Sequence, residues 1–91
     1  MAAKNMDQEW RRAVKGLLRQ EMHDKKMTYA DLAEALVPWG IQEDERNLRN
    51  KLARGAFSAT FLIQCLAAME VKSLALAECV ERMRIKITDG S

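Results

Sequence analysis

The chain has 91 residues and a net charge of +2, with 48% hydrophobic and 31% charged residues. This length suits one domain, and the composition is that of a soluble folded protein rather than a disordered one. Four glycines and one proline are few for a β-rich fold, so the composition predicts an all-α protein. Since no apolar run approaches the roughly 20 residues of a membrane-spanning helix and the first residues do not resemble a signal peptide, we expect a cytoplasmic protein.

Charge is distributed unevenly along the chain. Residues 27–45 contain five acidic and no basic side chains, whereas residues 46–55 contain four basic and no acidic ones. Such local segregation can attract a polyanion even when the total charge is close to zero. The segment 46–55 is therefore the first candidate for a nucleic-acid contact.

The first two helices are predicted from caps and periodicity. Residues 6–23 carry an apolar stripe that includes Trp10, with Asn5 as the expected N-cap. The second helix is expected to begin after Thr28, which forms a capping box with Asp31, and to end near residue 36 because Pro38 follows. The outer side of the first helix and the loop after it carry the cations Arg11, Arg12, Lys15, Arg19, Lys25 and Lys26.

A third helix is predicted over residues 42–54. Its first turn would be Glu43-Asp44-Glu45, because the helix dipole favours anions there, and Gly55 would end it. Before this helix, Gly40 permits a positive φ, and Trp39 is expected to cover a thin core.

Ser58 is the expected N-cap of a fourth helix that is apolar on almost all sides, including Phe61 and Ile63. A fifth helix is expected from Ser73 to about residue 82, burying its apolar side chains Leu76, Ala77 and Val80. These last two helices carry more apolar surface than one small core can bury, which predicts a homodimer that forms through them. Residues 83–91 alternate like a strand that has no partner in this chain, and they stay unassigned.

Two segments carry a family resemblance. Residues 28–36, TYADLAEAL, resemble the second helix of the phage-repressor and Cro-type (lambda repressor-like) helix-turn-helix domain, and residues 48–55, LRNKLARG, resemble its recognition helix. Residues 57–71 resemble the fourth helix of that family. The chain also resembles a group of small bacterial proteins of unassigned function with an Asn-Leu-Arg-Asn-Lys core followed by Arg-Gly and Phe-Ser. The resemblance implies a five-helix bundle, with residues 1–91 forming a single helix-turn-helix domain whose core spans about 6–82.

The resemblance further implies a sequence-specific duplex-DNA-binding regulator of transcription that places the third helix in the major groove. Arginine pairs with the acceptors of guanine and asparagine with adenine, and both types lie on the predicted outer face. Phosphates at the groove edges would be bound by Arg49 and Lys51. The candidate DNA-binding residues are Arg46, Asn47, Arg49, Asn50, Lys51 and Arg54.

The interval from Gly40 to Gly55 departs from the family, because it is about three residues longer than usual and places three carboxylates at the start of the third helix. Two alternatives therefore stay open. The chain either keeps the fold as a protein-interaction module that docks through the acidic segment 27–45, or forms the antitoxin or regulatory half of a two-protein pair.

Enzyme activity has no support in the sequence. It contains no phosphate-cradling glycine loop, no Gly-x-Ser-x-Gly turn, and a single histidine, His23, without an evident nucleophile beside it. Cys65 and Cys79 lack metal-ligand spacing, so we expect free thiols. We expect no cofactor, no metal, no small-molecule substrate and no membrane partner.

Overall fold

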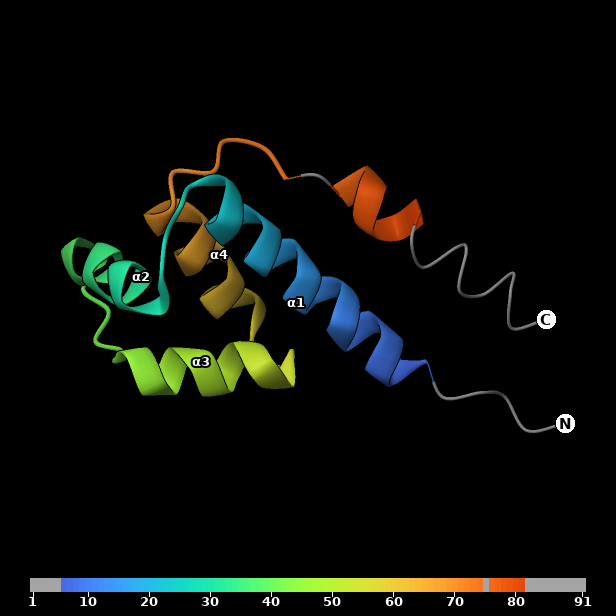
Figure 1. Cartoon of the computed structure of the whole chain (residues 1–91), viewed down its shortest axis with the longest axis horizontal. Coiled ribbons are helices and arrows are strands. Elements are labelled where there is room, and N and C mark those ends of the chain that lie inside the picture. Colours follow the sequence, from blue (N-terminus) through green and yellow to red (C-terminus); the bar gives the residue numbers. More distant parts are fainter. Residues whose placement is uncertain (1–5, 75, 82–91) are drawn as a thin grey trace, which may run out of the picture.

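The computed structural model describes residues 6–74 and 76–81, and all regular structure within them is helical. The elements are α1 (Asp7–Asp24), α2 (Tyr29–Leu36), the 3-10 helix η1 (Val37–Trp39), α3 (Glu45–Arg54) and α4 (Ala59–Ala68). Residues 76–81 are helical as well. The predicted all-α bundle is thus confirmed (Figure 1). The expected cap Asn5 and the unassigned segment 83–91 lie outside the described residues.

The three shorter α-helices pack at one end of the long helix α1. Helix α2 contacts both α3 and α4, and α1 contacts α3. Figure 1 shows that the N-terminal end of α1 extends past the end of α3, which meets α1 near Arg11. The segment 76–81 lies against α1, where Glu78 and Cys79 border a small pocket with Ala13 and Gly16.

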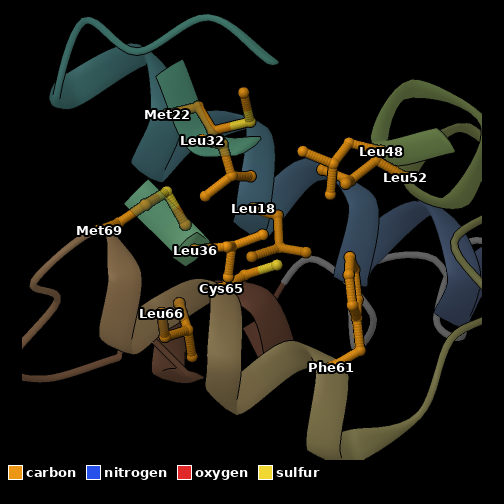
Figure 2. Packing of buried hydrophobic residues seen from close by; sticks show 10 residues of the cluster. All are labelled: Leu18, Met22, Leu32, Leu36, Leu48, Leu52, Phe61, Cys65, Leu66 and Met69. Carbon is orange, nitrogen blue, oxygen red and sulfur yellow. The ribbon is translucent and has the colours of Figure 1, made fainter. Parts of the chain in front are cut away.

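The hydrophobic core draws side chains from all four α-helices. Each helix contributes residues three or four positions apart, which places them on one face. Figure 2 shows these side chains pointing toward one another between the helices, with Met69, which follows α4, at the edge of the cluster. The buried residues are Leu18, Met22, Leu32, Leu36, Leu48, Leu52, Phe61, Cys65, Leu66 and Met69.

Three of the helices begin at a capping side chain. The hydroxyl of Thr28 accepts a hydrogen bond from the Asp31 amide at 3.1 Å, and the Thr28 amide donates to the Asp31 carboxylate at 2.9 Å. The Ser58 hydroxyl accepts from the Phe61 amide at 3.0 Å. These two predicted caps are confirmed. In α1, by contrast, Met6 is the N-cap and makes no side-chain capping bond.

Gly40 and Gly55 adopt the left-handed conformation, with φ of 79° and 64°, as their positions after helices predict. At Gly55 a second constraint applies, because a Cβ atom there would lie 2.5 Å from the backbone oxygen of Arg11. The missing side chain is what allows the end of α3 to approach α1 this closely.

Helix α3 begins three residues later than predicted. Asp44 is its N-cap and accepts a hydrogen bond from the Asn47 amide at 2.7 Å. Only Glu45 therefore lies in the first turn, and Glu43 precedes the helix. The prediction was wrong because an aspartate is more favourable as the N-cap than inside the first turn. At the N-cap its carboxylate accepts a hydrogen bond from a backbone amide that has no partner within the helix.

Both tryptophans are more exposed than predicted. Trp10 is 46% exposed, because one side of it borders an open hollow that Gly55 and Phe57 also line. Trp39, expected to cover the core, is 61% exposed. It belongs to η1, which continues the chain beyond α2 instead of folding back over the core.

The apolar excess of α4 is also smaller than its sequence indicates. Phe61 is buried in the core, and its ring meets that of Phe57 edge to face at 5.2 Å between centroids. Ile63 remains 62% exposed. In the segment 76–81, Leu76 and Ala77 are exposed rather than buried. The homodimer stays a prediction.

Candidate nucleic-acid interface

One face of α3 is exposed and polar along its whole length. At about 100° per residue, Arg46, Asn50 and Arg54 follow one another on this face, with Asn47 beside them. All four are exposed, whereas Leu48 and Leu52 on the opposite side are fully buried. Within the described part of the chain, none of the four side chains has a hydrogen-bond or ion-pair partner. We call these four residues the open face of α3.

The other two predicted DNA-binding residues flank the open face and bind within the protein. Arg49 lies 3.3 Å from the Glu45 carboxylate, and its guanidinium is 5.3 Å from the centre of the Tyr29 ring on α2. Lys51 bonds to Glu43, with its ammonium 4.8 Å from the centre of the Phe61 ring on α4. Arg49 therefore attaches α3 to α2, and Lys51 attaches it to α4. These contacts disfavour Lys51 in particular as a phosphate ligand.

The acidic residues before and at the start of α3 are each engaged by a neighbour. Glu43 bonds to Lys51, Asp44 caps the helix, and Glu45 pairs with Arg49. Glu43 is nearly enclosed, with only 11% of its side chain exposed. Because two of the three charges are compensated by adjacent cations, the repulsion of an approaching phosphate is reduced.

The cations of α1 are distributed around the junction with α3. Lys15 donates a hydrogen bond to the Ala53 carbonyl at 3.2 Å, and Arg11 pairs with Asp7 at 2.9 Å. Of the loop lysines, Lys25 donates to the Glu70 carbonyl at 3.4 Å, on the α4 side. Of these cations, Lys15 thus lies beside α3 and Lys25 beside α4.

A hollow at the start of α2 was not foreseen as a site. It measures about 440 Å³, and Arg19 from α1 borders it together with the paired Arg49 and Glu45 from α3, next to Thr28 and Tyr29. The two arginines are 30 residues apart in the chain, so only the packing of α1 against α3 brings them together. A signal in the sequence was present, since both were placed on outer helix faces.

Cys65 is buried next to the Glu43–Lys51 pair. The pKa of its thiol is raised to about 12, mainly by burial and also by the negative charge of Glu43, while the positive charge of Lys51 acts in the opposite direction. The described residues hold no group of three or more His, Cys, Asp or Glu that would suit a metal ion. Among the same residues, no helix is both long and apolar enough to cross a membrane.

A family described as "Domain of unknown function (DUF6471)" matches residues 10–74. The matched region begins at Trp10 in α1 and ends after α4, so it includes α2, α3 and the contacts around the open face. The comparison with curated proteins found no match, and the comparison with solved structures found none.

Proposed function

We propose that this chain, which belongs to the DUF6471 family of unknown function, binds duplex DNA by placing the open face of α3 in the major groove. By occupying its site it would regulate transcription. The observation that carries this proposal is the open face itself, where Arg46, Asn47, Asn50 and Arg54 are exposed without partners in the described part of the chain.

The chemistry of the open face fits base edges. An α-helix fits the major groove, where arginine bonds to guanine and asparagine to adenine through paired hydrogen bonds. Arg46 and Asn50 are separated by one helical turn, and Arg54 by a second, so the three can meet successive base pairs. Side chains that are already bonded within the protein would first have to lose those bonds, whereas these four have none to lose.

The contacts around the open face support its presentation as a rigid unit. Arg49 ties α3 to Tyr29, Lys51 ties it to Phe61, and Lys15 bonds to the carbonyl of Ala53 near its end. A recognition helix that is held from three sides loses little freedom on binding, which favours affinity. Arg19, beside the hollow at the start of α2, is suited to the DNA backbone.

The alternative functions depend on the acidic segment 27–45 as a protein-docking surface. In the structure, Glu43 and Asp44 belong to the support of α3 instead. Reversing their charges would disrupt that support and therefore would not separate a DNA function from a protein function. Glu34, which is exposed and has no partner in the described part, is the residue to reverse for that purpose.

The test is fluorescence anisotropy of a labelled mixed-sequence duplex, titrated with the protein at about 50 and 200 mM salt. We expect micromolar binding at low salt that weakens by orders of magnitude at high salt, because phosphate contacts release counterions. The double variant Arg46→Ala/Arg54→Ala should weaken it strongly. Lys72→Ala, which removes one exposed charge beyond α4, is the control and should have little effect.

Two results would contradict the proposal. If the protein binds no duplex at either salt concentration, the open face is not a DNA interface, and a pull-down with Glu34→Lys as control would test the protein-docking alternative. If binding occurs but Lys72→Ala weakens it as much as the double arginine variant, the interaction reflects general charge rather than α3.

A further inference from the structure

The 3-10 helix η1 presents two apolar side chains on a fixed backbone. Val37 and Trp39 are 64% and 61% exposed, although η1 is held by hydrogen bonds from the Gly40 amide to the Val37 carbonyl (2.9 Å) and from the Ile41 amide to the Leu36 carbonyl (3.3 Å). Pro38 restricts the same turn further. Exposed apolar groups on a constrained backbone are typical of interaction surfaces. We call Val37, Pro38 and Trp39 the apolar knob.

An apolar groove lies where α1 passes the start of α4. It measures about 500 Å³, and its apolar walls are Trp10 and Val14 from α1 and Phe57 from the loop before α4. Gly55 and Ala56 line it between these walls. The edge-to-face contact of Phe57 with Phe61 fixes one wall to the core. The groove is therefore a preformed site with room for a large apolar side chain.

The knob and the groove have complementary surroundings. On the knob side, Asp31 and Glu34 are exposed on α2, and segment 27–45 contains no basic residue. On the groove side, the lining residues Asp7 and Arg11 pair with each other at 2.9 Å. Lys15 and Arg54 follow and precede the lining residues Val14 and Gly55 and make the rim of the groove positive. An acidic knob and a groove with a positive rim attract each other across two molecules.

The two features lie at opposite ends of the molecule. Figure 1 shows η1 beyond α2 at one end of the long axis, and the N-terminal half of α1 toward the other. A copy that inserts its knob into a neighbour's groove still offers its own groove to a third copy. Such heterologous contacts generate open chains unless the rotation between copies closes a ring.

We propose that a second copy of this chain occupies the groove, with Trp39 of one molecule packed between Trp10 and Phe57 of the next. The contact is head to tail, and it differs from the two-fold dimer that the apolar character of α4 predicts. It uses neither Ile63 nor the segment 76–81, and of the open face of α3 it involves only the charge of Arg54.

The experiment uses two variants that each remove one half of the contact. Trp39→Ser removes the knob and leaves the groove intact. Ala56→Glu fills the groove and adds a charge of the same sign as the knob, at a residue that is exposed. Ile63→Ser is the matched control, because Ile63 is 62% exposed and Trp39 61%. Circular dichroism would confirm that all three variants fold.

Average mass is then measured by sedimentation without DNA, from about 1 µM to about 1 mM protein. We expect the mass of the unmodified protein and of Ile63→Ser to rise with concentration past that of a dimer. Each of the other two variants should stay monomeric. Their equimolar mixture should reach the mass of a dimer and rise no further, because only one knob and one groove are intact in it.

Three outcomes would overturn the proposal: a monomeric unmodified protein at the highest concentration, association of either single variant at the level of the unmodified protein, or a mixture that stays monomeric. Loss of association in Ile63→Ser alone would assign the contact to α4 instead. Since no DNA is present, none of these results depends on whether α3 binds a duplex.

Discussion

The ammonium group of Lys51 bonds to the carboxylate of Glu43 and lies 4.8 Å from the centre of the Phe61 ring. Glu43 precedes α3, Lys51 belongs to it, and Phe61 is a core residue of α4. One side chain therefore joins the loop before α3, the helix itself and the core. This arrangement fixes the register in which α3 presents its open face.

Lys51→Met removes the charge and keeps much of the apolar side chain. We expect the free energy of unfolding to fall by about 1–3 kcal/mol, because Glu43, whose side chain is 11% exposed, loses its cation. Urea denaturation measures the loss. Arg11→Met is the control, because the carboxylate of its partner Asp7 is 58% exposed, and should cost less than about 1 kcal/mol. Equal losses in the two variants would show that Lys51 contributes no more than a surface charge.

Features that depend on neighbouring residues could be predicted from the sequence. The capping box at Thr28, the cap at Ser58 and the left-handed Gly40 and Gly55 follow from local backbone chemistry, and the structure confirms them. The buried stripe of α3, Leu48 and Leu52, follows from helical periodicity in the same way. The polar outer face of α3 was predictable because it is the other half of that pattern.

Features that depend on the relative placement of helices could not be predicted. Periodicity assigns Trp10 to the same stripe as Leu18, but it does not show that the neighbouring loop before α4 leaves Trp10 46% exposed. Similarly, nothing in the spacing of Glu43 and Lys51 shows that the helix begins between them. Once Asp44 is recognised as the cap, the different positions of the other two carboxylates follow, with Glu43 before the helix and Glu45 in its first turn.

The two left-handed glycines differ in what surrounds them. At Gly40 a Cβ atom meets nothing within 4 Å, so Gly40→Ala should cost only the backbone strain of about 1–2 kcal/mol. At Gly55 the same atom would lie 2.5 Å from the Arg11 carbonyl oxygen, so α1 must shift. We expect Gly55→Ala to cost about 3 kcal/mol or more. Thermal unfolding of both variants compares them directly. Equal losses of stability would show that α1 can shift at Gly55 without a further cost in free energy.

The two thiols should react at very different rates. Cys65 is fully buried and the pKa of its thiol is raised to about 12, while Cys79 is half-buried. Thiol reagents attack the thiolate, so in native protein near pH 8 we expect rapid modification of Cys79 and slow modification of Cys65. In urea both should react alike. The variant Cys79→Ser should lose the rapid phase. A rapid phase that persists in this variant would mean that the core opens readily around α4.

The same raised pKa makes stability depend on alkaline pH. The thiol ionises near 9.0 in the unfolded chain but only near 12 in the folded protein. Below pH 9 both states keep the proton, whereas between these two values only the folded state does, so the free energy of unfolding falls as pH rises. We expect the urea midpoint of the native sequence to fall more between pH 8 and pH 10 than that of Cys65→Ala. Parallel curves would contradict this.

The open face of α3 predicts which substitutions change sequence preference. After a preferred duplex is selected from a random pool, Arg46→Ala and Asn50→Ala should each weaken binding to it by about 1–3 kcal/mol, because each removes a paired contact with one base. Their binding to unrelated duplexes should change much less. Lys72→Ala, which removes an exposed charge beyond α4, should leave the ratio of selected to unrelated binding unchanged. Competition titrations at one salt concentration measure these ratios. If Arg46→Ala and Asn50→Ala weaken both classes of duplex equally, the open face contacts phosphates, and bases are recognised elsewhere.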